Sequence, residues 1–448
     1  MSNKIKLKIK KFIPTLKLAI PLITILISQI GMEFTETIMV GKIGIIHLAA
    51  MAISGSIYIT IIILCIGILT SIGVLISHEI GKNNYKFIEK HLFHGFLLSI
   101  ILSIPTISLV WYMPYVLYLI GENQQIIELS EIYLHSIIWG IPGFLGFITL
   151  KEYTTAIKYP NIIMWISLIA LPINACLNYL FIYGFSYFEP LGISGAGYAS
   201  AIIEWIMFLS ISSIIIVKKK LKIFIFFKKK IQLPIIKEML NIGWPVGIMF
   251  GCEIGLFSVI AIIMGRFGTH TLAAHQIAIQ ISNLSFIFFL GIAQATGIKV
   301  AQAAGKKDIN EINNSTKIGI EINLIIAIIF TFVLYLFPKN ITNIFVNTNI
   351  STNKDILFLT IDFIHIVAIY QIFDALQAIT NSSLRGLKDT FSPMWIGMLS
   401  YWIIGLSCGF ISSYFFNLKG KGLWIGLTIG IIIFNILLLS RFYKKLTK

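Results

Sequence analysis

Long apolar stretches, separated by short polar ones, run along the whole of this 448-residue chain. Most reach about 20 residues, the length at which an α-helix crosses the hydrocarbon core of a bilayer. Their residues do not alternate between polar and apolar, as the strands of a membrane β-barrel do. The pattern therefore predicts an all-α membrane protein with twelve transmembrane helices. The predicted spans are 15–38, 48–78, 92–118, 129–151, 160–184, 193–216, 238–263, 272–302, 316–337, 356–382, 393–415 and 422–442.

Several glycines and prolines of the chain recur at a spacing of 224 positions. The segment Gly41–Ala50 (GKIGIIHLAA) returns as Gly265–Ala274 (GRFGTHTLAA). The same spacing pairs Pro21 with Pro245, Gly67 with Gly291, Gly73 with Gly297, and Gly81-Lys82 with Gly305-Lys306. With six spans in each half, both halves enter the bilayer in the same direction, which predicts parallel repeats related by an axis along the membrane normal.

This repeat predicts the domain organisation. We expect an N-terminal lobe at 1–217, a cytoplasmic basic linker at 218–233 and a C-terminal lobe at 234–448. Phenylalanines 224, 226 and 227 lie among the lysines of the linker, so we expect this segment on the membrane surface.

Composition agrees with a membrane protein. Hydrophobic residues make up 57% of the chain and charged residues 12%, whereas a soluble domain carries about 25% charged residues. The first span follows a basic stretch at 4–11, but it is too long for a signal peptide and many spans follow it, so we expect a retained helix. The four cysteines lie in apolar segments without metal-ligand spacing and are expected to be buried free thiols.

The basic residues behind the net charge of +16 lie mainly in short loops and at the chain ends. This placement indicates membrane topology rather than a nucleic-acid interface. With twelve spans, most basic loops fall on one side, whereas Lys42, Arg266 and Lys339 are among the few basic residues on the other. By the positive-inside rule the basic side is cytoplasmic, and both termini lie there. We expect a multi-pass monomer in the inner membrane. Its partners should include the lipid bilayer but no nucleic acid.

Carboxylates inside the spans are the informative minority in this chain, because a charge at the bilayer centre costs at least about 2.5 kcal/mol. The candidates are Glu36, Glu204, Glu253, Glu321, Asp362 and Asp374. Glu321 and Asp362 lie near span ends, where the simpler interpretation is that they reach the interface.

Two of these acids are the main candidates in the second half. Glu253 lies at mid-span without an intrahelical base, and Asp374 has Tyr370 one turn before it and Gln377 one turn after it. Carboxylate, phenol and amide oxygens suit a hard monovalent cation or a proton relay. The alternative is a protonated Glu253 that hydrogen-bonds a neighbouring helix.

In the first half the comparable acid is Glu36. Asn174 and Asn178 lie four residues apart after Pro172 and form either a polar site or interhelical hydrogen bonds. His275 and Gln276 follow the repeated Leu-Ala-Ala, and both a site role and polar packing remain open for them.

Enzyme signatures are missing from the sequence. It has no His-Glu-x-x-His, no Walker lysine loop and no nucleophile elbow. We therefore expect no enzyme, and transport driven by an ion gradient rather than by a nucleotide.

Several stretches of the chain resemble one family, the multidrug and toxic compound extrusion (MATE) transporters, and within it the NorM-like bacterial branch. They are residues 36–41 (ETIMVG), 245–253, 272–278 (LAAHQIA), 370–377 and 383–389 (SLRGLKD). The resemblance covers nearly the whole chain and implies two six-helix lobes that meet in a V.

The resemblance also implies the site residues. The family's cation site would fall on Glu253, Tyr370 and Asp374, and its first-lobe polar site on Glu36, Asn174 and Asn178. NorM-like relatives usually carry Asp where this chain has Glu36, which is one methylene longer. The resemblance implies no cofactor and no metal beyond a sodium ion.

The function expected on this basis is multidrug efflux by antiport, in which sodium or protons enter and cationic or aromatic small molecules leave. A lipid-linked precursor flippase of the same superfamily is the nearest alternative, but it would need several Arg or Lys residues within the spans. A polytopic membrane enzyme is a more distant one and would need a clustered catalytic set.

Overall fold

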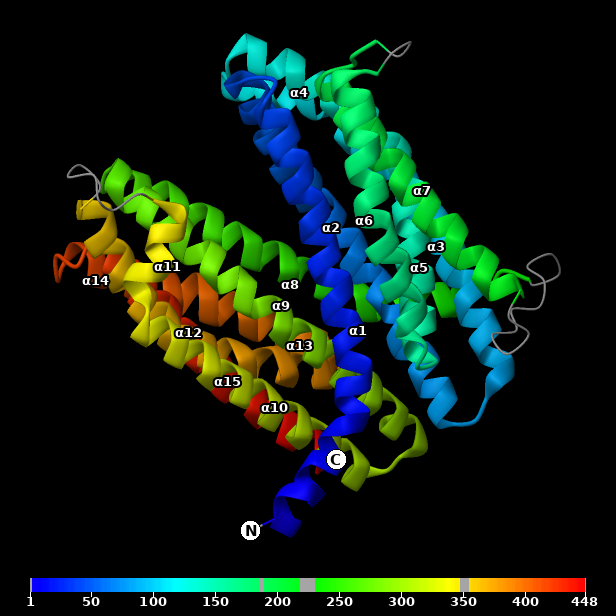
Figure 1. Cartoon of the computed structure of the whole chain (residues 1–448). Helices are drawn as coiled ribbons and strands as arrows, with labels where there is room; N and C mark the ends of the chain where they lie inside the picture. The colour runs from blue at the N-terminus through cyan, green and yellow to red at the C-terminus, as the bar shows by residue number, and fades with distance from the viewer. Residues whose placement is uncertain (1, 186–188, 218–229, 347–353, 448) are drawn as a thin grey trace. The chain divides into compact units, whose positions relative to one another are not determined.

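The protein is all-helical in the computed structural model of its chain, which describes residues 2–185, 189–217, 230–346 and 354–447, with side chains from residue 11 onward (Figure 1). Within these residues, twelve helical stretches are long and apolar enough to cross a membrane, which confirms the predicted count. The helices are α1 (Ser2–Gly41), α2 (Ile45–Gly81), α3 (Tyr85–Ile120), α4 (Gln124–Ile137), α5 (Ile141–Ala156), α6 (Pro160–Tyr183), α7 (Ile193–Val217), α8 (Leu233–Arg266), α9 (Thr269–Lys306), α10 (Ile309–Leu336), α11 (Pro338–Phe345), α12 (Lys354–Gly386), α13 (Phe391–Gly397), α14 (Leu406–Tyr414) and α15 (Gly420–Leu446).

Two predicted spans are interrupted helices. The fourth consists of α4 and α5 joined by one 3-10 turn at Ile138–Gly140. The turn ends two residues before Pro142, whose backbone nitrogen has no hydrogen to donate. The eleventh consists of α13, a π-helical segment at Met398–Gly405 and α14. The short helix α11 was not predicted, because at eight residues it is too short to register as a span.

Packing divides the chain into two compact units. Unit 1 comprises residues 1–23 and 248–448, and unit 2 comprises residues 24–247. The boundaries fall inside α1 and α8, whereas the sequence placed them at the linker 218–233. The predicted basic linker lies largely outside the described residues, and so do the three phenylalanines assigned to the membrane surface.

The two units exchange equivalent segments. Unit 1 contains the first part of α1, where Thr15, Leu18 and Leu22 are buried. Unit 2 contains the first part of α8, where residues 239, 242 and 246, each 224 positions later, are buried in the same way. The repeat read from the sequence therefore extends to the pattern of burial.

Glycines allow each exchanged segment to pack closely. A Cβ on Gly291 would meet Ile23 of α1 within unit 1, and a Cβ on Gly67 would meet the backbone of Gly247 of α8 within unit 2. In unit 1 the Lys299 Nζ also donates a hydrogen bond to the Thr15 Oγ1 at 2.9 Å. The two glycine contacts are equivalent in the repeat, since Gly67 and Gly291 are 224 positions apart and so are Ile23 and Gly247.

The backbone turns repeat as well. Asn83 and Lys307 follow α2 and α9 with left-handed φ angles of 57° and 61°. Lys158 and Lys388 follow α5 and α12 with φ angles of 64° and 61°. Non-glycine residues in this conformation are uncommon, so their recurrence after α2 and α9, and after α5 and α12, indicates that both units are built on one plan.

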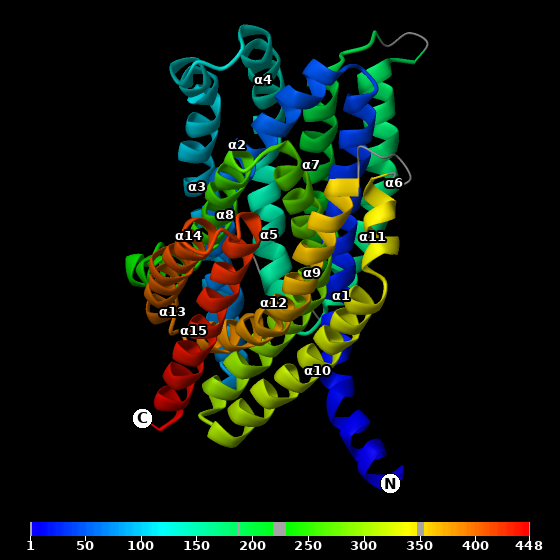
Figure 2. The same ribbon diagram turned by 90° about the vertical axis from the view of Figure 1, so that its left-hand side faces the viewer.

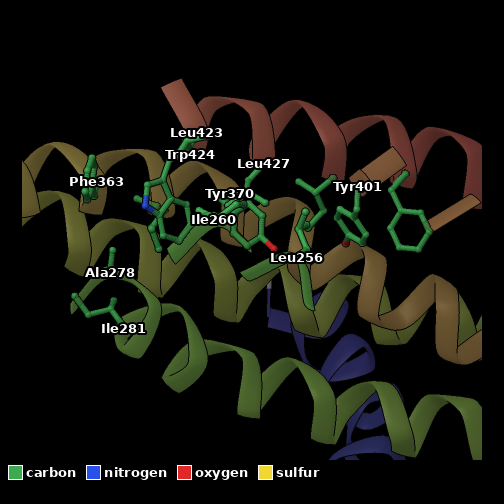
Figure 3. Packing of buried hydrophobic residues seen from close by; sticks show 14 of the residues in the cluster. Leu256, Ile260, Ala278, Ile281, Phe363, Tyr370, Tyr401, Leu423, Trp424 and Leu427 are labelled. Atoms are coloured by element: carbon green, nitrogen blue, oxygen red, sulfur yellow. The ribbon is translucent and has the colours of Figure 1, made fainter. Parts of the chain in front are cut away.

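Each unit has its own core. In unit 2, α2 packs against α3, α4 and α5, and α7 packs against α4, α5 and α6. In unit 1, α12 packs against α9, α10 and α15 (Figure 2). A cluster of apolar and aromatic side chains that includes Phe363, Trp424 and Leu427 fills the space between the unit 1 helices (Figure 3).

The prediction of four buried cysteines was wrong in part. All four are free thiols, but only Cys65 is buried, whereas Cys176 is exposed and Cys252 and Cys408 are partly exposed. An apolar span has one face toward the protein and one toward lipid, and the sequence does not tell which face a cysteine occupies.

Candidate functional site

Unit 1 brings together the three residues of the predicted cation site. Tyr370 and Asp374 lie one turn apart on α12 and are 3% and 4% exposed. Glu253, partly buried on α8, lies within electrostatic range of both side chains. No hydrogen bond or ion pair to the Glu253 carboxylate occurs among the described residues.

Gln377 belongs to the same face of α12. Its Nε2 donates to the Asp374 Oδ1 at 3.4 Å, which is long for a hydrogen bond. The Gln377 Oε1 is buried and has no partner within the described part of the chain. The amide nitrogen of this side chain is therefore only weakly bonded beside Asp374, and its amide oxygen is unbonded among the described residues.

Tyr401, in the π-helical segment, is a further candidate for the site that the sequence did not reveal. Its hydroxyl is buried without a described partner, and Tyr370, Glu253 and Asp374 lie within electrostatic range of it. Figure 3 shows Tyr370 between Trp424 and Tyr401. π-helical segments are frequent at functional sites, but no pattern in this sequence predicts one.

His275 and Gln276 separate in the structure. Gln276 is exposed, whereas His275 is fully buried and neither of its ring nitrogens has a partner among the described residues. The His275 ring contacts Trp424 edge-to-face at 5.6 Å, and Trp424 contacts Tyr370 in the same way at 6.0 Å. His275 therefore lies behind the site, two aromatic contacts from Tyr370.

In unit 2, Glu36 on α1 is 8% exposed and accepts two hydrogen bonds. The Tyr133 hydroxyl of α4 donates to its Oε1 at 2.9 Å, and the Ser200 hydroxyl of α7 donates to its Oε2 at 2.8 Å. The sequence predicted the acid but not these donors, which come from helices 97 and 164 positions away. Two donors on two oxygens are the arrangement that an ionised carboxylate accepts.

Asn174 and Asn178 are both buried on α6 and bond to each other, with the Asn178 Nδ2 donating to the Asn174 Oδ1 at 3.1 Å. The Asn178 Oδ1 has no partner in the described part of the chain. No hydrogen bond to Glu36 from either amide occurs among the described residues. α6 instead reaches α1 through the Tyr183 hydroxyl, which donates to the Met39 carbonyl at 2.7 Å.

Asp362 lies near the start of α12 and is paired with a base. It forms an ion pair with Lys421 at 2.6 Å, and both side chains are about two-fifths exposed, at 40% and 42%. An exposed, neutralised carboxylate is unsuited to binding a cation from within the membrane.

The two units do not duplicate their chemistry, although they share a scaffold. In the 224 register the counterpart of Glu253 is Gln29 and the counterpart of Glu36 is Ile260. Unit 1 gathers two carboxylates and phenols, and unit 2 surrounds Glu36 with hydroxyl donors. Oxygen atoms of these kinds bind hard cations or relay protons.

Comparison with known proteins covers nearly the whole chain. The family model MatE matches residues 21–180 and 245–411. The "Probable multidrug resistance protein NorM" of Mesorhizobium japonicum is 28% identical over 96% of this chain and 93% of its own length. The "Multidrug resistance protein NorM" of Vibrio cholerae serotype O1 is 29% identical, covering 96% and 94%.

The fold is also similar to that of a solved structure. A multidrug resistance MATE family transporter of the MOP superfamily, solved in an outward-facing conformation, has a TM-score of 0.89 and 19% identity, covering 98% of this chain and 96% of that one. At this identity the likeness concerns the fold.

Proposed function

Because this chain belongs to the MatE family, we propose that it is a multidrug efflux transporter and not an enzyme. Two similar proteins are named for multidrug resistance. The observation that carries the proposal furthest is the unit 1 site, in which Glu253 and Asp374 lie near each other inside the membrane-spanning helices without a described base. Such a pair is costly to retain unless a cation or proton occupies it.

The proposed mechanism is antiport coupled to a sodium ion or proton. The cation enters down its gradient and binds at Glu253, Tyr370 and Asp374, and a cationic or aromatic small molecule leaves. Glu36, with Asn174 and Asn178 on the neighbouring helix, is the proposed polar site of unit 2. Coupling requires that each ligand bind one conformation of the transporter more tightly than the other.

We propose an inner-membrane monomer with cytoplasmic termini. The distribution of basic loop residues supports this orientation. The two chain ends support it as well, since both belong to unit 1 and Figure 2 shows them at the same end of that unit.

Reconstituted liposomes test the proposal. Liposomes containing the purified protein are loaded with ethidium, a cationic aromatic dye. Efflux is measured first under an imposed sodium gradient with the proton gradient collapsed, and then under an imposed proton gradient with the sodium gradient collapsed. We expect one gradient to accelerate efflux by about tenfold or more over protein-free liposomes, since about 1.4 kcal/mol of coupling corresponds to tenfold. Efflux that ignores both gradients would contradict ion coupling, and transfer of a lipid-linked substrate alone would favour the flippase.

A further inference from the structure

Glu204 is a span acid of unit 2 that the proposed site leaves unused. It lies on α7 four residues after Ser200, so both side chains emerge from the same face of the helix. Ser200 donates to the Glu36 Oε2 at 2.8 Å. The same face of α7 therefore carries one side chain bound to Glu36 and, one turn further on, a second acid.

The environment of Glu204 is not that of a structural acid. Its Oε2 is buried and has no hydrogen-bond partner among the residues that the structure describes. Buried carboxylates that serve packing are normally bonded to donors or paired with bases. Glu36 shows the contrast within the same unit, because both of its oxygens accept hydroxyl hydrogen bonds.

Tyr58 of α2 connects the two acids. Both Glu204 and Glu36 lie within electrostatic range of its hydroxyl. Tyr133 of α4, which donates to Glu36, also lies within electrostatic range of Tyr58. Glu33, one turn before Glu36 on α1, lies within electrostatic range of Glu36 and Tyr133. Four helices of unit 2 thus contribute oxygen atoms to this region, which includes Glu33, Glu36, Tyr58, Tyr133, Ser200 and Glu204.

We propose that Glu204 is a second cation-binding carboxylate of unit 2, which binds a proton or sodium ion one helical turn from the Ser200 that holds Glu36. Glu36 is already supplied with donors, whereas the Glu204 Oε2 offers a free oxygen for the incoming cation. A carboxylate inside a span is costly to keep ionised without a partner, and a bound cation or proton offsets that cost. Tyr58 and Ser200 add neutral oxygen atoms, which hard cations also accept as ligands.

This inference rests on the proposed ion-coupled efflux and adds a residue that the family resemblance did not supply. Two variants test it in the full-length protein, Glu204→Gln and Glu204→Asp, with Glu131→Gln as the control. Glu131 is an exposed carboxylate on α4, the helix that also carries Tyr133. All variants are compared at equal amounts of inserted protein.

The first measurement is ethidium efflux under the gradient that drives the unsubstituted protein. We expect Glu204→Gln to lose about tenfold or more of the gradient-driven rate while Glu204→Asp and the control retain it. Unchanged gradient-driven efflux in Glu204→Gln would overturn the inference and leave the proposed function intact. Absence of gradient-driven efflux in the unsubstituted protein would instead defeat the proposed function.

The second measurement does not depend on transport. Dicyclohexylcarbodiimide modifies protonated carboxyl groups in apolar surroundings, and peptide mass spectrometry locates the adduct. We expect an adduct on Glu204 that decreases severalfold when sodium chloride replaces choline chloride, or when the pH is raised if the proton is the ligand. An adduct yield at Glu204 that neither sodium nor pH changes would overturn cation binding at this residue.

Discussion

The buried acids of the two units are held in different ways. Glu36 receives hydrogen bonds from Tyr133 and Ser200, so both of its oxygens have partners within the protein. Glu253 has no described hydrogen bond and lies near Asp374, so the pair depends on a ligand for neutralisation. The unit 1 acids should therefore respond most strongly to loss of charge.

We expect Glu253→Gln and Asp374→Asn each to reduce gradient-driven efflux by about tenfold or more, because an isosteric amide keeps the shape and removes the charge that a cation needs. Efflux from liposomes and the melting temperature of the purified variants would be measured together. Melting within a few degrees of the unsubstituted protein would separate loss of function from loss of fold. Unchanged gradient-driven efflux in both variants would show that the unit 1 site is assigned wrongly.

At Glu36 we expect the Asp variant to be tolerated and the Gln variant to lose most activity. Aspartate keeps a carboxylate that two hydroxyl groups can approach, whereas glutamine has one oxygen acceptor and places an amide donor against one of the hydroxyls. Drug accumulation in cells would be compared at matched membrane levels of each variant. Full resistance from Glu36→Gln would reduce this residue to a packing role.

The acids of both sites could be predicted from the sequence, because a carboxylate in an apolar span is conspicuous by itself. Their partners could not. Tyr133, Ser200 and Tyr401 are ordinary residues of apolar helices, and only the tertiary packing places their hydroxyls beside the acids. The proposed link between Glu36 and the Asn174–Asn178 pair came from the resemblance and stays a prediction.

At the scale of the helices, α14 and α15 meet through their backbones. A Cβ on Gly426 would meet the Cα and N of Gly409, and a Cβ on Gly430 would lie 2.9 Å from the Ser400 carbonyl oxygen. Small residues one turn apart let membrane helices approach this closely. This contact lies beside the π-helical segment that carries Tyr401.

We expect Gly426→Ala to destabilise unit 1 by about 1–3 kcal/mol, the usual cost of overpacking a close contact. The melting temperature of the detergent-purified protein should fall by several degrees. Gly55→Ala on α2 is the matched control, since a Cβ at that position meets nothing within 4 Å. Equal melting temperatures for the two variants would contradict the close packing of α14 on α15.

The number of spans could be predicted because length and apolarity decide it locally. The 3-10 turn between α4 and α5 and the π-helical segment could not be predicted. A change in the spacing of a few backbone hydrogen bonds leaves the hydropathy pattern unchanged. The short helix α11 escaped notice for a related reason. Its eight residues are too few to stand out from a loop.

At the scale of the whole molecule, two continuous helices, α1 and α8, pass from one unit into the other. The 224-residue repeat predicted two similar halves, but the lobe boundaries that it suggested differ from the packing boundaries inside these helices. A sequence repeat shows which residues are equivalent and not which copy they pack against. The exchange is a property of tertiary structure alone.

Splitting the chain tests the exchange. We expect residues 1–223 and 224–448, expressed as separate chains, to be unstable alone and to restore efflux when produced together, because unit 1 needs residues 1–23 and unit 2 ends in α8. Each fragment would be followed by its resistance to protease in membranes. A stable fragment 224–448 on its own would show that unit 1 does not depend on α1.

The exchanged helix segments also bear on ancestry. A duplicated gene explains two halves in one register, and its precursor would have encoded six spans. If that precursor packed as the present units do, the first segment of each copy completed its neighbour, as Leu18 and Ile242 do now at equivalent positions. Such a half-length protein would have been an obligate dimer of intertwined subunits. Fusion of the two genes would then have made that partnership permanent and left each copy free to acquire its own acids.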